Sequence, residues 1–203
     1  MTQQINNFTG MTNGYIKRME RFDYGEIHLV LGPMYSGKSS ELIQIIKKYK
    51  LLGIEIMTIN HSFDTRYGSN KIVTHDGNDV ECVQTDNLMS LKDNPNYIKS
   101  KVIVIEEGQF FTDLFDFVIH CCYTDNKRVY IAGLNGDFQK KSMGDILKLI
   151  PQCDSLVKLS ALCMECKDGT LAHFSKRIID NTNDIVIGSV DTYIPVCRKH
   201  HSD

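Results

Sequence analysis

The sequence lacks the long apolar run that a membrane span requires. No stretch of the 203 residues approaches the roughly 20 consecutive apolar residues needed to cross a bilayer. The N-terminus also lacks the continuous apolar block of a secretory signal, and residues 1–24 are polar. We therefore expect a cytoplasmic protein without a membrane partner, in which residues 1–24 form a flexible leader.

The chain also lacks a surplus of basic charge. It carries 23 Lys and Arg residues against 25 Asp and Glu residues, so its formal net charge is −2. Such a balance provides no general attraction for nucleic acid, and we expect no nucleic-acid partner. The 7 cysteines are odd in number, which is not typical of a full disulfide framework.

Short apolar segments alternate with segments of helical periodicity. This order predicts an α/β fold, a doubly wound parallel sheet whose ligand crevice lies beyond the carboxyl ends of the strands. After about residue 152 the segments become shorter and turn-rich, so residues 25–152 form the predicted main domain and 153–203 a small second module. The predicted strands of the sheet cover residues 27–31, 54–59, 102–105 and 129–134; the predicted helices cover 40–52 and 110–123; the short strands of the second module cover 156–159, 171–174 and 185–187.

A phosphate-binding loop lies between the first predicted strand and the first predicted helix. The eight residues match the P-loop pattern at every fixed position, with Gly37 allowing close approach of phosphate, Lys38 reaching the outer phosphates and Ser39 ligating Mg²⁺. A chance strand-to-helix turn is the alternative, and no Asn-Lys-x-Asp tetrapeptide indicates a GTPase of the Ras kind. The expected ATP-binding residues are Gly32, Pro33, Met34, Tyr35, Ser36, Gly37, Lys38 and Ser39.

Two carboxylates follow the strand predicted at residues 102–105. Glu106 and Glu107 would lie at the carboxyl end of that strand, where the crevice is expected. One carboxylate can hold Mg²⁺ while the other takes a proton from a hydroxyl group, the two roles that a kinase needs. The alternative is a pair of solvated residues at the start of a loop.

Two pairs of potential metal ligands lie near the C-terminus. Cys163 and Cys166 form one pair, and Cys197 and His200 form the other, each with two intervening residues. Thiolate and imidazole groups at this spacing predict a closed, structural Zn²⁺ site. A redox-active Cys-x-x-Cys is the alternative, and His201 competes with His200 for the fourth position.

These motifs resemble the type II thymidine kinases, the cellular and poxviral family. The P-loop and the acidic pair followed by Gly-Gln-Phe-Phe carry the resemblance, which extends from about residue 25 to 200. It implies transfer of the γ-phosphoryl group of ATP to the 5′-hydroxyl of thymidine in nucleotide salvage for DNA synthesis, with deoxyuridine as a second substrate. The implied catalytic residues are Glu107 as base, Lys38, and Arg66 at the transferring group; Glu106 stands where the family has Asp in the Mg²⁺ shell.

The same resemblance implies a nucleoside pocket closed by a lasso that the zinc site holds at both ends. It also implies a homotetramer inhibited by thymidine triphosphate. Asn135, Asp137 and Ser189 depart from the family pattern around this pocket. The implied substrate-binding residues are Met34, Phe110, Leu134, Phe138, Phe174, Ser175, Ile187, Gly188 and Tyr193.

Two other functions are compatible with the motifs. One is a P-loop ATPase whose zinc module binds nucleic acid, which the Lys and Arg content does not favour. The other is a family member that has lost catalysis, for which Glu106 is the only indication.

Overall fold

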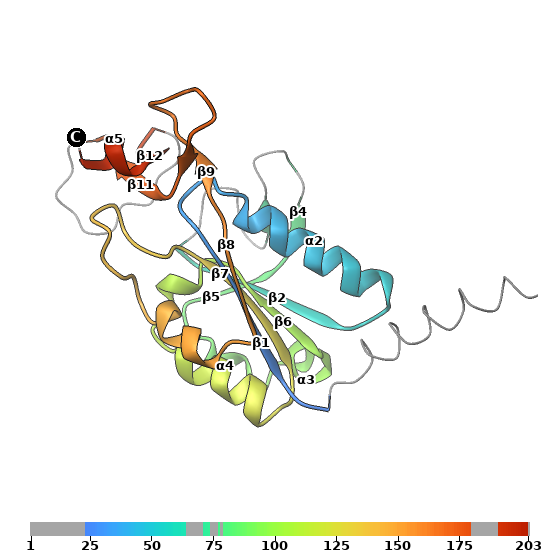
Figure 1. Ribbon diagram of the computed structural model, residues 1–203. Helices are drawn as coiled ribbons and strands as arrows, with labels where there is room; N and C mark the ends of the chain where they lie inside the picture. The colour runs from blue at the N-terminus through green and yellow to red at the C-terminus, as the bar shows by residue number, and fades with distance from the viewer. Residues whose placement is uncertain (1–22, 64–70, 74–76, 78, 180–190, 203) are drawn as a thin grey trace, which may run out of the picture.

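A six-stranded parallel sheet forms the centre of the computed structural model, which describes residues 23–63, 71–73, 77, 79–179 and 191–202 (Figure 1). Its strand order is β5-β2-β6-β7-β1-β8, and every neighbouring pair runs parallel. The strands are β1 (Glu26–Leu31), β2 (Ile56–His61), β5 (Val83–Thr85), β6 (Val102–Ile105), β7 (Arg128–Gly133) and β8 (Ser155–Lys158).

Helices cover both faces of this sheet (Figure 1). In β6, Ile103 and Ile105 pack on the face covered by α4 (Leu114–Tyr123), whereas Val102 and Val104 pack on the face covered by α2 (Lys38–Leu51). Alternate strand residues point to opposite faces, so a fully apolar strand needs cover on both sides. The doubly wound α/β prediction is confirmed. The short helices are η1 (Met89–Leu91), α3 (Pro95–Lys99), η2 (Gly108–Phe110) and η3 (Ile146–Gln152).

The predicted helices begin and end close to the observed ones, with one interruption. After α2, Gly53 adopts a left-handed φ of 68° and the N–H of Ile54 donates to the carbonyl of Tyr49 at 3.2 Å. Residues 52–54 form the turn that ends the helix and are therefore not part of the strand. For this reason β2 begins at Ile56 and not at residue 54. The helix predicted at 110–123 is divided, because η2 closes a tight turn before α4 begins at Leu114.

The strand predicted at residues 156–159 was assigned to the wrong part of the fold. It is β8, which pairs with β1 at the edge of the central sheet, with Leu29 opposite Leu156. Leu156 and Val157 are each 44% exposed, as expected on an uncovered edge. The apolar pattern of a short strand does not specify which other strand it pairs with. The sequence pattern could therefore not place this strand beside β1. The division of the chain into domains stays a prediction.

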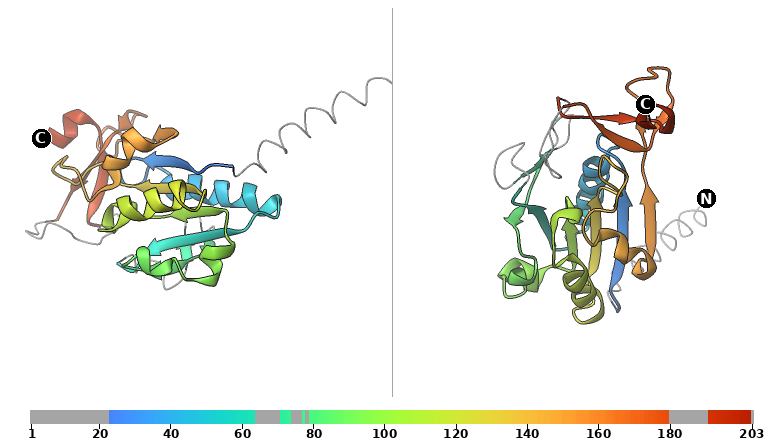
Figure 2. Two further views of the ribbon diagram at one scale, coloured as in Figure 1. Left: turned by 90° about the horizontal axis from the view of Figure 1, so that it is seen from below. Right: turned by 90° about the vertical axis from the view of Figure 1, so that its left-hand side faces the viewer.

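The C-terminal module, residues 161–179 and 191–202, lies beyond the carboxyl end of β1. Figure 2 shows its orange and red segments at one end of the molecule. The strand predicted at 171–174 is divided between two antiparallel pairs, and the strand predicted at 185–187 lies outside the described residues. The elements are β9 (Ala161–Leu162), β10 (Leu171–Ala172), β11 (Phe174–Arg177), β12 (Tyr193–Val196) and α5 (Arg198–Ser202).

Strands β5, β9 and β12 and one antiparallel strand pair were not predicted. Strands β3 (Lys71–Val73) and β4 (Asp79–Glu81) pair antiparallel, and their Ile72 and Val80 join the core on the α2 face. None of the helices in the described part of the chain is both long and apolar enough to cross a membrane.

Candidate active site

The P-loop connects β1 to α2 at the carboxyl edge of the sheet, where the sequence predicted it. Gly32 has no room for a side chain, since a Cβ would lie 2.5 Å from Ser36 Oγ. Ser36 Oγ and Lys38 Nζ both donate to the carbonyl of Pro33, at 2.9 and 2.8 Å. Gly37, at a left-handed φ of 86°, is the N-cap residue that precedes α2 and directs the helix N-terminus at the loop. The loop therefore combines N–H groups, a helix end and a buried ammonium group, which together suit phosphate.

Glu106 contacts the end of the P-loop. It is buried at the carboxyl end of β6, and Ser39 Oγ donates to its Oε1 at 2.5 Å. The structure thus brings together the two residues predicted to hold Mg²⁺. A hydroxyl and a carboxylate oxygen side by side are hard ligands of the kind that Mg²⁺ prefers, so the residues present fit the ion.

Glu107 leaves the strand in an unusual backbone conformation. Its φ and ψ are 55° and 40°, in the left-handed region that non-glycine residues rarely occupy. Its carboxylate accepts a hydrogen bond from Gln109 Nε2 at 2.6 Å. Gln109 was not among the predicted site residues, although it lies within the Gly-Gln-Phe-Phe segment.

An aromatic wall stands beside this carboxylate. The ring of His61, at the end of β2, lies 5.8 Å from the ring of Phe110 and 4.7 Å from that of Phe63. Burial lowers the pKa of His61, although Asp86, Glu107 and Asp113 act in the opposite direction. The N–H of Phe63 donates to His61 Nδ1 at 3.0 Å, so the neutral ring carries its proton on Nε2. Phe110, a predicted substrate contact, is thereby fixed at the site.

The loop after β7 and the C-terminal module meet through Arg177. Its guanidinium lies 3.7 Å from the ring centre of Phe138 and donates to Tyr193 Oη at 2.9 and 3.3 Å. Phe138 and Tyr193, both predicted pocket residues, are thus joined by a residue that the sequence analysis did not place in the site. Within the loop, the N–H groups of Gln139 and Lys141 donate to Asp137 Oδ1, each at 2.8 Å, so this departure from the family pattern organises the turn.

The C-terminal module also contacts the P-loop. Ser175, buried in β11, accepts a hydrogen bond from the N–H of Met34 at 3.0 Å. Phe174 lies between two cations, with Lys140 Nζ 5.7 Å and Arg198 Cζ 4.9 Å from its ring centre. Leu134 is held through its N–H, which donates to Gln109 Oε1 at 3.0 Å. Three predicted site residues, Arg66, Ile187 and Gly188, lie outside the described residues.

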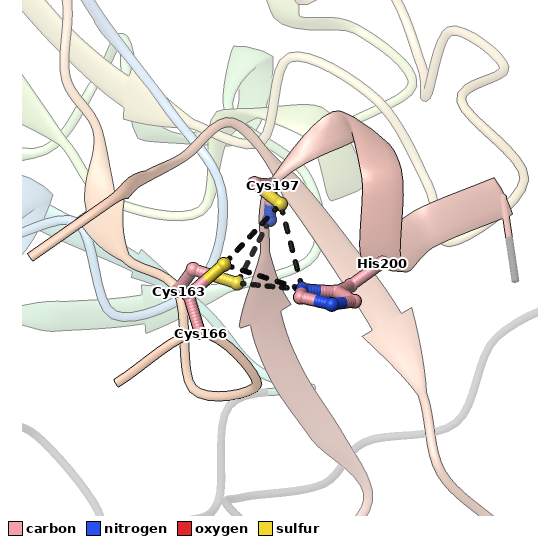
Figure 3. A group of neighbouring side chains, drawn as sticks. All are labelled: Cys163, Cys166, Cys197 and His200. Atoms are coloured by element: carbon pink, nitrogen blue, oxygen red, sulfur yellow. Dashed lines mark hydrogen bonds between the residues drawn. The ribbon is translucent and has the colours of Figure 1, made fainter. Parts of the chain in front are cut away.

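The four predicted zinc ligands converge on one point (Figure 3). Their sulfur atoms and His200 Nδ1 all lie within 4.8 Å of one another. Cys166 Sγ and Cys197 Sγ are 3.8 Å apart, and His200 Nδ1 lies 3.3 to 3.6 Å from the three sulfurs. A tetrahedral Zn²⁺ with bonds of about 2.3 Å to sulfur requires ligand separations of about 3.8 Å, so the residues fit this ion.

The electrostatics of the cluster favour at least one thiolate. Burial opposes the charged form of Cys163. Main-chain N–H groups that donate hydrogen bonds to its sulfur, together with His200, outweigh burial and lower the pKa of this thiol to about 6. One of those donors is the N–H of Cys197, at 3.2 Å. A thiolate is the form that binds Zn²⁺.

His200, and not His201, joins the cluster. His201 Nε2 instead donates to the carbonyl of Phe138 at 2.9 Å, and its ring meets Phe174 edge-on at 5.4 Å. The two adjacent histidines therefore have different partners, one in the metal cluster and one in the loop after β7. Of the two candidates, only His200 has a ring nitrogen among the three sulfurs, and the choice of zinc ligand stays a prediction that this geometry supports.

Comparison with known proteins identifies relatives over nearly the whole chain. A family model described as thymidine kinase matches residues 25–201. A protein of Arabidopsis thaliana named thymidine kinase a is 40% identical over 194 residues, which cover 94% of this chain and 81% of the relative. The thymidine kinase of sheeppox virus is 43% identical over 87% of this chain and 97% of the relative, and that of vaccinia virus strain Western Reserve is 40% identical over 88% and 98%.

Proposed function

The chain belongs to the thymidine kinase family, and from this premise we propose that it transfers the γ-phosphoryl group of ATP to the 5′-hydroxyl of thymidine. The products are thymidine monophosphate and ADP, a step of nucleotide salvage that supplies DNA synthesis. One structural observation carries the proposal beyond the family match: the P-loop, Glu106 and Glu107 lie together at the carboxyl edge of the sheet, with Ser39 bonded to Glu106 at 2.5 Å. The alternative of a nucleic-acid-stimulated ATPase is not favoured.

The triphosphate lies on the P-loop in this proposal. The N–H groups of the loop and the N-terminus of α2 bind its oxygens, and Lys38 reaches the outer phosphates. Ser39 and Glu106 hold Mg²⁺, which when bound neutralises charge on the phosphates. Ser39 lies in the first turn of α2, and Glu106 directly follows β6. Because both residues are held by regular elements of the fold, they position the γ-phosphoryl group without a large rearrangement.

Glu107 acts as the general base. Its carboxylate takes the proton of the 5′-hydroxyl while that oxygen forms a bond to the γ-phosphorus and the bond to the β,γ-bridging oxygen breaks. Gln109 donates to one carboxylate oxygen at 2.6 Å, which supports a fixed orientation of the group that accepts the proton. Arg66, assigned by the family resemblance alone, stabilises charge on the transferring group.

The nucleoside occupies the space between the loop after β7 and the C-terminal module. Phe110, Phe138 and Tyr193 line it, and the lasso that the zinc ligands hold closes over the base. Groups that recognise the pyrimidine edge discriminate strongly against a base without matching partners, but weakly against the loss of one methyl group. Deoxyuridine is therefore the second substrate. A homotetramer, inhibition by thymidine triphosphate and a cytoplasmic location complete the proposal and rest on the family resemblance.

The assay uses purified protein, ATP, Mg²⁺ and radiolabelled thymidine. We expect labelled thymidine monophosphate, no requirement for DNA or RNA, and slower phosphorylation of deoxyuridine. Glu107→Gln removes the basic oxygen with little change in size, so turnover falls at least about 100-fold while KM for thymidine stays within about 3-fold. Turnover near the wild-type rate in this variant would remove Glu107 from the role of base, and absence of product in the wild type would refute the activity.

A further inference from the structure

We propose that Gln109 is a positioning residue, which holds the carboxylate of Glu107 in its reactive orientation and links it to the loop after β7. The inference rests on the proposed role of Glu107 as the base. Gln109 lies in η2, is only 3% exposed, and uses both ends of its side-chain amide. Nε2 donates to Glu107 Oε2 at 2.6 Å, and Oε1 accepts from the N–H of Leu134 at 3.0 Å.

The orientation of this amide follows from its partners. The main-chain N–H of Leu134 can only donate, so the amide oxygen must face it. The amide nitrogen is then directed at Glu107, whose carboxylate oxygen can accept it. The planar amide of glutamine has a donor at one end and an acceptor at the other. Neither a glutamate nor a lysine side chain offers both at neutral pH.

The surrounding backbone leaves space for this side chain. A Cβ on Gly133, the last residue of β7, would lie 2.5 Å from Gln109 Oε1. A Cβ on Gly144 would lie 2.1 Å from the main-chain carbonyl oxygen of Gln109, and Gly144 also has a left-handed φ of 54°. Two glycines thus make the approach of Gln109 possible, one beside its amide and one beside its backbone.

Glu107 needs such support because its own backbone is in a disfavoured region. At a φ of 55° the residue is held by its surroundings and not by local preference. The hydrogen bond from Gln109 fixes one oxygen of this carboxylate in place. The contact to Leu134 extends the link to the loop that carries the nucleoside wall, so the base and that wall are positioned by one side chain.

Two substitutions separate the two ends of the amide. Gln109→Glu keeps an acceptor for the N–H of Leu134 but replaces the donor to Glu107 by a second carboxylate. Gln109→Met keeps the length of the side chain and removes both hydrogen bonds. Gln152→Met is the matched control, because Gln152 is exposed and its Oε1 accepts only a surface bond from Tyr123 at 3.1 Å.

Single-turnover rates and KM for thymidine, measured at neutral pH on zinc-loaded protein, test the inference. The hydrogen bond to the Glu107 carboxylate is lost in both variants, so the rate falls roughly 10- to 100-fold in both. In Gln109→Glu the loss is confined to this rate, because the acceptor for the N–H of Leu134 is kept. KM for thymidine rises about 3- to 10-fold in Gln109→Met only, because only that variant loses the bond to Leu134. Gln152→Met matches the wild type.

The outcomes distinguish this inference from the proposed function. A merely structural Gln109 would lower the melting temperature or the active fraction without separating the rate from KM between the two variants, and that result would overturn the inference while Glu107→Gln stays inactive. If Glu107→Gln keeps its turnover, the assignment of the base is wrong and the positioning role is lost with it. Thermal melting of each variant, with its bound zinc, identifies any variant that fails to fold, and Gly133→Ala then provides a second test. Its added Cβ would lie 2.5 Å from Gln109 Oε1 and equally close to Ile146 Cδ1, so it displaces the amide without changing its chemistry. A lower single-turnover rate is expected in the folded variant, and an unchanged rate contradicts the inference.

Discussion

Arg177 provides the sharpest test of how the C-terminal module forms the nucleoside pocket. Its guanidinium packs on Phe138 at 3.7 Å and donates to Tyr193 Oη at 2.9 and 3.3 Å. A hydrogen bond from a charged donor contributes about 1.5–3 kcal/mol, and a cation over an aromatic ring about 0.5–2 kcal/mol. Since Arg177 is partly exposed, we take the lower end, about 2 kcal/mol in total, which corresponds to roughly a 30-fold change in an equilibrium constant.

We expect Arg177→Met to raise KM for thymidine about 10- to 30-fold and to leave kcat within about 3-fold, because the variant disturbs the pocket wall and not the reacting groups. KM for ATP should change less. Lys48→Met is the charge-matched control, since Lys48 is an exposed residue in the last turn of α2, whereas the P-loop precedes the first turn of that helix.

A double-mutant cycle with Tyr193→Phe isolates the bond itself. Tyr193→Phe keeps the ring and removes the acceptor, so in the wild-type background KM for thymidine should rise several-fold. In the Arg177→Met background the same change should have little further effect, giving a coupling energy of about 1 kcal/mol or more. Additive effects of the two substitutions, or a change in KM of less than about 2-fold in Arg177→Met, would refute the link between the two walls.

The remaining predictions concern the two histidines near the zinc site and Glu106, the proposed Mg²⁺ ligand. His200→Ala should lose stoichiometric zinc and lower the melting temperature by roughly 5 °C or more. His201→Ala should keep its zinc and raise KM for thymidine several-fold, because it loses the bond to the carbonyl of Phe138 and the contact with the ring of Phe174. Zinc analysis and thermal melting decide this, and zinc loss in His201→Ala would contradict the assignment. Glu106→Asp withdraws the carboxylate by roughly 1.5 Å from Ser39, so the Mg²⁺ concentration for half-maximal activity should rise about 10-fold. An unchanged Mg²⁺ titration would show that Glu106 does not hold the ion.

Features governed by local rules were predictable from the sequence. The P-loop, the apolar strand before Glu106 and the paired zinc ligands are short contiguous patterns with a fixed geometry, and the structure has each of them in the expected place. Both candidates for the fourth zinc ligand, His200 and His201, were also visible in the sequence. It could not choose between His200 and His201, because the choice depends on how α5 turns after Cys197.

Features that depend on distant partners were not predictable. β8 pairs with β1 over 120 residues away in the chain, and nothing in its short apolar pattern specifies that neighbour. Gln109 was visible only as part of a family segment, because its importance comes from the N–H of Leu134, which any residue would offer. Arg177 was similarly indistinguishable from a surface cation until the ring of Phe138 was placed beneath it.

Strand β11 contacts both the P-loop and the aromatic pair Phe138 and Tyr193, through two residues on the same face of the strand. Ser175 and Arg177 lie two positions apart, so their side chains project from the same face of the strand. Ser175 accepts the N–H of Met34 in the P-loop at 3.0 Å, while Arg177 holds the wall formed by Phe138 and Tyr193. The zinc cluster fixes the end of the partner strand β12, which pairs with β11 residue by residue. A displacement of β11 would therefore move the contacts to the P-loop and to Phe138 and Tyr193 together, so in the proposed function a zinc ion at the Cys/His cluster would stabilise the relative position of the two reactants as well as the fold of the module.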